Sequence, residues 1–306
     1  MKRTLGTLLL LFIYLGLSAQ YYTGHTKNSQ NEALLNPAYV AIHDQITISG
    51  SLKNQLGQGS PIPSTQQINV FGIMKHYNFG LGFNAVNEFD GENFQRLFSF
   101  SYAYRIDKEE REVSFGMNVG TKTFKYKMLP TQDLDSFSQI KPHYEIEVSP
   151  VFGLGMHIQG NRYSFDISVP YFFRESVNPQ KYQPTNNLVF LQLQGSYLFK
   201  GGYDKAFKPF FYLRYGNQVE IEERLEYFAG TQIYINKWWD FGITYLSNEE
   251  IALNIQNEFH MYWKLAYTYS VTSSHISENP WGEHILSLAY NIQRGYKIEP
   301  DKQRYF

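Results

Sequence analysis

A regular alternation of large apolar residues with small or polar ones is the feature that most constrains this fold. In the segment 261–271, alternate positions carry large apolar side chains: Met261, Trp263, Leu265, Tyr267, Tyr269 and Val271. The positions between them are mostly small or polar: Tyr262, Lys264, Ala266, Thr268 and Ser270. Successive side chains of a β-strand point to opposite faces, so this period predicts strands with one apolar face. A crowded face of small residues suits the wet inner wall of a membrane barrel, and the apolar face suits lipid.

About fourteen segments show this alternation, and each is near or above the roughly 9–11 residues that a tilted strand needs to cross a bilayer. Their expected cores are 44–53, 65–75, 77–87, 93–106, 111–125, 144–158, 161–173, 187–200, 207–218, 223–236, 238–247, 250–258, 260–272 and 284–293. The even count fits a single-chain bacterial barrel. The sequence therefore predicts an all-β fold, a single transmembrane antiparallel β-barrel of about fourteen strands over residues 44–293.

Composition supports a barrel and argues against several other classes of protein. Aromatic residues make up 17% of the chain, yet the mean hydropathy is −0.39, which is too polar for a helical membrane protein. Cys is absent, which excludes disulfides, thiolate zinc sites, cysteine nucleophiles and a lipid-modified cysteine anchor. The net charge of −1 offers no basic footprint for nucleic acid.

The N-terminus has the organisation of a cleaved export signal. Lys2 and Arg3 precede the apolar run Leu8 to Leu17, which is too short to span a bilayer as a helix. We expect cleavage after Ala19. Residues 1–19 are then the signal peptide, 20–43 a periplasmic N-terminal segment and 294–306 a C-terminal tail.

The lengths of the links between strands predict the orientation of the barrel. Long links are expected at Asn54–Ser64, Lys125–His143, Arg174–Asn186 and Thr272–Glu283, and tight links mostly alternate with them. Outer-membrane barrels have short periplasmic turns and long external loops. The long links are therefore expected outside the cell, and both ends of the mature chain in the periplasm. Two links depart from this order. The link 201–206 is longer than expected for the periplasmic side, and the link 247–249 is tight where a long loop is expected.

The chain carries no motif that predicts catalysis, a cofactor or a metal. Its eight His residues are scattered without metal-ligand spacing, and no nucleophile elbow or phosphate loop is present. Gly80, Gly82, Gly153 and Gly155 are expected to face inward, where the wall needs little volume or is closely approached. The charged residues Arg105, Asp166 and Lys264 also fall on predicted inner faces, as a lumenal charge network or as a selectivity or docking surface.

Several short motifs, in order along the chain, resemble the PorP/SprF family. Asn36-Pro37-Ala38-Tyr39 resembles the N-P-A-Y-A-G start of that family, and Gly80-Leu81-Gly82 followed by Asn87 resembles its third strand. Further similar segments are 101–105, 113–116, 152–155 with 168–170, 263–269 and 283–290. Members of the family are outer-membrane components of the type IX secretion and gliding apparatus of Bacteroidetes. Such chains commonly stop at the last strand, whereas about a dozen residues follow Gln293 here.

The resemblance implies a barrel that is not an enzyme and that helps export or surface-anchor a large adhesin. Its expected partners are outer-membrane lipid, an adhesin with a C-terminal sorting domain and periplasmic type IX components. Asn36, Pro37, Ala38 and Tyr39 are the candidate partner-binding residues, since a defined turn at this position could plug the periplasmic mouth, dock a partner or merely lead into the first strand. The alternatives are a passive porin or hydrophobic-solute channel and, with less support, an outer-membrane enzyme.

Overall fold

The computed structural model describes most of the barrel and a short segment that precedes it. The described residues are 32–42, 44–55, 63–74, 78–90, 93–108, 111–128, 143–175, 186–202, 205–218, 221–236, 238–247, 249–259, 262–272 and 282–293. The expected signal peptide, most of the long links and the C-terminal tail lie outside these residues. No helix among them combines the length and the hydropathy that crossing a membrane requires.

The described chain is nearly all strand. Two short helices come first, α2 (Glu32–Leu35) and the 3-10 helix η1 (Pro37–Ala41). The strands are β1 (Gln45–Gln55), β2 (Ser64–Ile73), β3 (Phe79–Asp90), β4 (Asn93–Lys108), β5 (Arg111–Met128), β6 (His143–Gly160), β7 (Tyr163–Glu175), β8 (Asn186–Tyr197), β9 (Phe199–Lys200), β10 (Ala206–Gln218), β11 (Ile221–Ile235), β12 (Trp239–Leu246), β13 (Glu250–Phe259), β14 (Trp263–Thr272) and β15 (Glu283–Gln293).

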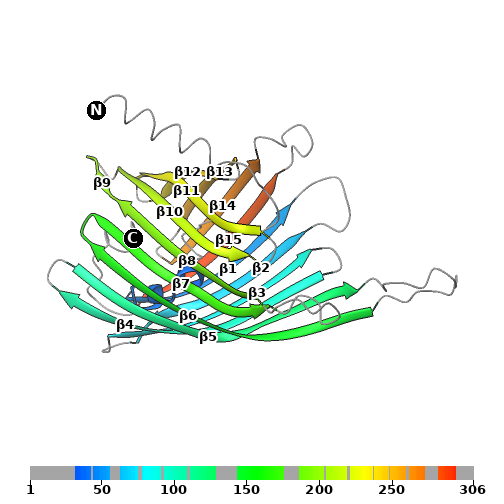
Figure 1. The fold of residues 1–306 in the computed structure, drawn as a ribbon. Helices are drawn as coiled ribbons and strands as arrows, with labels where there is room; N and C mark the ends of the chain where they lie inside the picture. Colours follow the sequence, from blue (N-terminus) through cyan, green and yellow to red (C-terminus); the bar gives the residue numbers. More distant parts are fainter. Residues whose placement is uncertain are drawn as a thin grey trace, which may run out of the picture.

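The strands form one closed antiparallel barrel (Figure 1). Each strand pairs with its neighbour in sequence, and β1 pairs with β15 from Gln45↔Gln293 to Gln55↔Glu283, which closes the wall. The two-residue β9 continues β8 after an interruption at Leu198, so the fifteen strand segments make a fourteen-stranded barrel. The predicted fold class and strand count are confirmed.

Strand length varies around the wall. β5 and β6 each have 18 residues, whereas β12 has 8. Because each residue advances a strand by about 3.3 Å, β5 and β6 reach well beyond their neighbours, as Figure 1 shows at their hairpin end. The wall is therefore taller at this hairpin than on the side of β12.

The two faces of the wall differ as the alternation predicts. Large apolar side chains are exposed on the outside, for example Phe100 at 63% and Met117 at 56%, while their neighbours Ser99 and Asn118 are buried on the inside. On β14, Trp263, Leu265 and Tyr267 are exposed, and Ala266 and Thr268 are buried. Polar inner residues bond across strands, as when Thr47 Oγ1 donates to Asn291 Oδ1 at 2.9 Å across the β1–β15 closure. The outer face is thus an apolar surface suited to lipid.

Candidate functional site

The segment 32–42, which we call the plug, is buried against the inner wall of the barrel, where η1 contacts β2 to β6 and α2 contacts β2 and β7. Its local conformation follows from its sequence. Asn36 has an extended backbone (φ −143°, ψ 113°), as expected for a residue before proline. The Asn36 side chain accepts a hydrogen bond from the Ala38 N–H at 2.9 Å, and Pro37 occupies the first helical turn. The Asn-Pro pair therefore begins η1.

Glycines in three strands leave the space in which the plug packs against the wall. A Cβ at Gly80 in β3 would overlap the Val40 carbonyl, and one at Gly116 in β5 would overlap the backbone of Pro37 and Ala38. A Cβ at Gly155 in β6 would overlap the Asn36 amide oxygen. Close approach of another backbone is the expected reason for glycine inside a strand. The wall is thus hollowed to fit this segment.

Asp166 of β7 is the centre of a buried hydrogen-bond network that binds the plug. Its carboxylate accepts from Asn36 Nδ2 at 3.0 Å and from the Tyr39 hydroxyl at 3.2 Å. His157 of β6 contacts the same oxygen as Asn36, with Nδ1 at 2.6 Å from Asp166 Oδ1. Gln194 Nε2 of β8 donates to the Tyr39 hydroxyl at 3.3 Å. A buried carboxylate needs such partners, because an unpaired one is costly.

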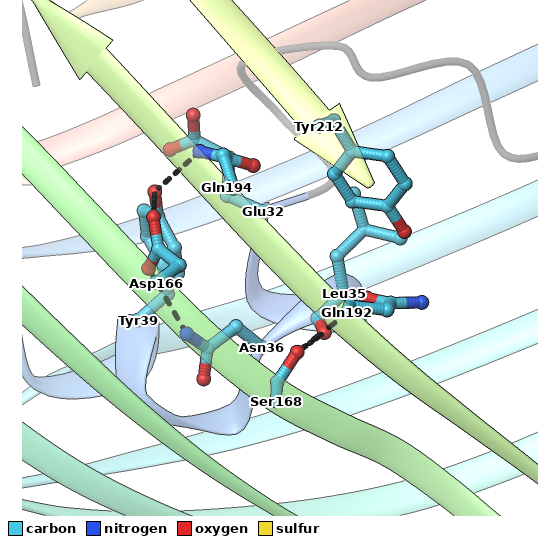
Figure 2. Close-up of a pocket in the computed structure, with 9 residues that line it drawn as sticks. All are labelled: Glu32, Leu35, Asn36, Tyr39, Asp166, Ser168, Gln192, Gln194 and Tyr212. Atoms are coloured by element: carbon cyan, nitrogen blue, oxygen red, sulfur yellow. Dashed lines mark hydrogen bonds between the residues drawn. The ribbon is translucent and has the colours of Figure 1, made fainter. Parts of the chain in front are cut away.

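Tyr39 remains a hydrogen-bond donor in this network. Burial, together with the nearby Asp166 carboxylate, holds the pKa of Tyr39 well above its ordinary value. Its hydroxyl is therefore protonated at any physiological pH and donates to Asp166. Figure 2 shows Tyr39, Asn36 and Asp166 turned toward one another, with Gln194 beside them.

The wall also holds the backbone of the plug. Ser168 Oγ donates to the Leu35 carbonyl at 2.9 Å, and Ser114 Oγ donates to the Ala38 carbonyl at 3.0 Å. Arg105 Nη1 donates to the carbonyls of Ala41 at 3.3 Å and Ile42 at 3.1 Å. Buried carbonyls at helix ends require such donors, so these side chains fix the plug at both ends.

Arg105 also forms the charged boundary of the site. Its guanidinium contacts Asp44 at 2.9 Å and Asp107 at 2.8 Å. Asp44 follows the plug closely and Asp107 is near the end of β4, so Arg105 ties the plug, the start of β1 and β4 together. Because both carboxylates are about half exposed, we expect the two ion pairs to add little to the stability of the folded barrel. The packing of the Arg105 side chain should contribute more.

A small crevice lies between the plug and strands β7, β8 and β10 (Figure 2). It encloses about 230 Å³ of empty space, part of it open to solvent. Its lining residues are mostly polar: Glu32, Leu35, Asn36, Tyr39, Asp166, Ser168, Gln192, Gln194 and Tyr212. Among the described residues, no group of three or more His, Asp or Glu is placed to hold a metal ion. The side chains that line the crevice can donate and accept hydrogen bonds.

The structure brings together some of the sequence-predicted site residues and separates one. Asn36, Pro37, Ala38 and Tyr39 are buried in the plug, and Arg105 and Asp166 both bond to it. Lys264 lies on β14 instead, where it pairs with Glu258 at 2.6 Å. The contacts favour a plugging role for residues 36–39. Their role in partner binding stays a prediction.

Sequence reasoning missed several residues that hold the plug, namely Ser114, Gly116, His157, Ser168 and Gln194. His157 and Asp166 are directly paired across β6 and β7. The alternation places both on inner faces, but it does not reveal which residues of two strands stand opposite each other. The tight link at 161–162 is the signal that could have revealed this pair. It sets the register of β6 against β7, and with that register the polar residues on the two inner faces can be matched.

Comparison with known protein families gives a match over most of the chain. Residues 17–290 match the family described as the type IX secretion system membrane protein PorP/SprF. The chain belongs to the PorP/SprF family. The resemblance of its motifs is thereby confirmed, and the chain is a membrane component of a type IX secretion system. The family and the barrel fold together support an outer-membrane location.

Solved structures share the barrel of this PorP/SprF protein at low sequence identity. The toluene transporter TodX of Pseudomonas putida is 9% identical, with a TM-score of 0.53 over 92% of this chain and 96% of that one. The CymD monoaromatic hydrocarbon channel is 12% identical, with a TM-score of 0.51 over 92% of this chain and 95% of that one. At such identities the likeness shows the fold alone. No curated protein matches the sequence.

Proposed function

We propose that this barrel helps export a large partner protein, such as an adhesin, or anchors it at the cell surface, without itself catalysing a reaction. Membership of the PorP/SprF family supports a role in secretion. The partners would be outer-membrane lipid, an adhesin with a C-terminal sorting domain and periplasmic components of the type IX machinery. A cleaved signal peptide would deliver the chain to the outer membrane.

The observation that carries the proposal is the packing of the plug into the hollowed wall. Barrels of 16–18 strands leave an aqueous channel, and this one has fewer strands and a segment fixed inside it. A folded domain of a large adhesin does not fit through such a space. The partner is therefore expected to engage the rim or the outer wall, with the barrel serving as a platform in the membrane.

A channel for hydrophobic solutes is the second candidate, and one observation favours it. Leu34 of the plug packs inside the barrel against the inward-facing Val86, Leu97, Phe124 and Val151. An apolar inner wall suits an apolar solute better than an ion. TodX is described as a toluene transporter and CymD as a monoaromatic hydrocarbon channel.

Deletion of the gene separates the two candidates. For the secretion role, we expect the deletion strain to lose one or more sorting-domain proteins from the surface proteome of intact cells, while uptake of a labelled monoaromatic hydrocarbon stays normal. Reintroducing the gene should restore display. Normal display with reduced hydrocarbon uptake would overturn the proposal in favour of the channel.

A further inference from the structure

Two cations lie around the ring of Phe94 on the outer wall of the barrel. The guanidinium of Arg96 in β4 is 4.5 Å from the centroid of this ring, and the ammonium of Lys125 in β5 is 5.5 Å from it. Lys125 stands directly opposite Phe94 in the ladder between β4 and β5. An aromatic ring attracts cations to its face. We call Phe94, Arg96 and Lys125 the cation cluster.

The cation cluster lies at the edge of the apolar band of the barrel. Along the outer face of β4, exposed apolar side chains run from Phe98 to Ile106, and Arg96 precedes Phe98 on that same face. At about 3.3 Å per residue and a tilt of about 40°, this run covers roughly 20 Å of membrane. The apolar band of an outer-membrane barrel is about 25 Å tall. Arg96 therefore stands where hydrocarbon gives way to lipid headgroups.

The side chain of Arg96 is exposed, and its partners orient it without neutralising it. Arg96 Nε donates to Asn87 Oδ1 of β3 at 3.1 Å, and Asn87 Nδ2 donates to Gln66 Oε1 of β2 at 3.5 Å. Within the described part of the wall, the guanidinium contacts the Asn87 amide and the Phe94 ring, and neither carries a charge. A guanidinium has further N–H groups on its terminal nitrogens, and these suit the oxygens of a phosphate.

We propose that the cation cluster binds the phosphate group of a lipid in the outer leaflet of the outer membrane. The guanidinium of Arg96 would bind two phosphate oxygens at once, and the ammonium of Lys125 would act as a point charge beside them. Two like charges near one ring repel each other, and an anion near both offsets this repulsion. Basic residues at the level of the headgroups attract anionic lipid for the same reason.

The wall beside the cluster favours a lipid over a free anion. Phe100 of β4 and Val119 of β5 are directly paired on the same outer face, and they are 63% and 51% exposed. A ligand with a phosphate at one end and acyl chains at the other contacts both the cations and this apolar surface. A free phosphate contacts the cations alone, and salt screens exposed charges.

The predicted orientation of the barrel specifies the leaflet. Lys125 lies near the end of β5 that leads into the link 125–143, which is expected outside the cell. The main lipid of that leaflet in Gram-negative bacteria is lipid A, a phosphorylated glycolipid, so we expect its phosphate at the cluster. The inference rests on the proposed function only for the contact with outer-membrane lipid, which it makes specific. It does not depend on the exported partner.

The test uses the full-length barrel, purified in mild detergent and freed of bound lipid, with native mass spectrometry to measure binding. The probes are lipid A, lipid A from which the phosphates have been removed, and inorganic phosphate alone. We expect the barrel to bind lipid A at least fivefold more tightly than the dephosphorylated form, and to give no adduct with inorganic phosphate. The double variant Arg96→Gln, Lys125→Gln should bind the two lipids equally, whereas Arg96→Lys should keep most of the preference.

Arg111 provides a matched control on the same strand. It is an exposed cation at the opposite end of β5, and it shares the outer face with Lys125 because the two residues are an even number of positions apart. Arg111→Gln should leave the preference for lipid A unchanged. Semi-native gels establish that each variant is folded before its binding is measured.

Three results would overturn the inference. These are equal binding of the two lipids by the unmodified barrel, an undiminished preference in the double variant, or an equal loss in Arg111→Gln. If the double variant does not fold, salt decides: sodium chloride should weaken binding of lipid A and not of its dephosphorylated form, and binding of lipid A that ignores salt would refute the site. The export role stands or falls separately, on whether deletion of the gene abolishes display.

Discussion

At the residue scale, the site depends as much on missing side chains as on present ones. Gly80, Gly116 and Gly155 leave room for the plug, and Asp166 binds its two polar side chains, Asn36 and Tyr39. The hollow and the hydrogen bonds act together, because a Cβ in the wall would push the plug away from Asp166. A substitution at any of these residues is therefore expected first to lower the stability of the folded barrel, and to change its other properties only through that loss.

Gly116→Ala tests the hollow directly. The added methyl group meets the backbone of Pro37 and Ala38, which cannot rotate away as a side chain could. We expect a loss of about 1–3 kcal/mol in the free energy of unfolding, as for other overpacked sites. Urea unfolding of the purified barrel in detergent measures this loss. Gly50→Ala is the control, since its nearest neighbour would be the Gln67 carbonyl at 3.7 Å. Equal losses in the two variants would refute the hollowed wall.

Tyr39 distinguishes plugging from docking. Tyr39→Phe removes the hydroxyl between Asp166 and Gln194 and should cost about 1–3 kcal/mol. Tyr39→Ala also leaves a cavity and should cost about 3–5 kcal/mol. If the plug is structural, display should fall only as far as the abundance of folded barrel falls. Normal abundance with lost display would instead assign docking to residues 36–39, and both quantities are measurable on the same cells.

At the scale of the strand, the alternation specifies which side chains meet lipid. On β14, Leu265 is exposed on the outer face between Trp263 and Tyr267. Leu265→Arg should lower the stability of the folded barrel by about 2–4 kcal/mol, because it places a cation on the lipid face. Leu265→Phe keeps that face apolar and should change stability little. The loss of heat-resistant folded species on semi-native gels gives the comparison. A tolerated arginine would mean that this face does not meet lipid.

The same alternation explains what sequence could and could not predict. The two-residue alternation identifies the strands and their inner and outer faces. For example, the start of β14 differs from that of its expected core only by a few residues. The sequence predicts a defined turn at residues 36–39, with a plug as one of its expected roles. Their bonds to Asp166 and Ser114 were not predictable, because they join residues more than 70 positions apart through a register that a single sequence does not specify.

For the whole molecule, the lengths of the links predict which end of the barrel faces the cell exterior. Long links are expected outside, so a cysteine placed at Ser136 should react with an impermeant thiol reagent on intact cells. A cysteine placed at Glu109 should react only after the outer membrane is permeabilised. Both positions lie outside the described residues, and neither cysteine has a native competitor because the chain has no Cys. The reverse pattern of labelling would show that the barrel has the opposite orientation in the membrane.

The plug also constrains the order of events during folding. Asn36 bonds to the Met156 carbonyl 120 positions away, and Tyr39 bonds to Asp166 127 positions away. The first part of the described chain therefore cannot reach its final contacts until β6 and β7 are in place. Closing loops of this length is slow. An insertion intermediate should accordingly carry a loose N-terminal segment open to protease, and the time at which this segment becomes resistant should mark the completion of the wall from β1 to β7.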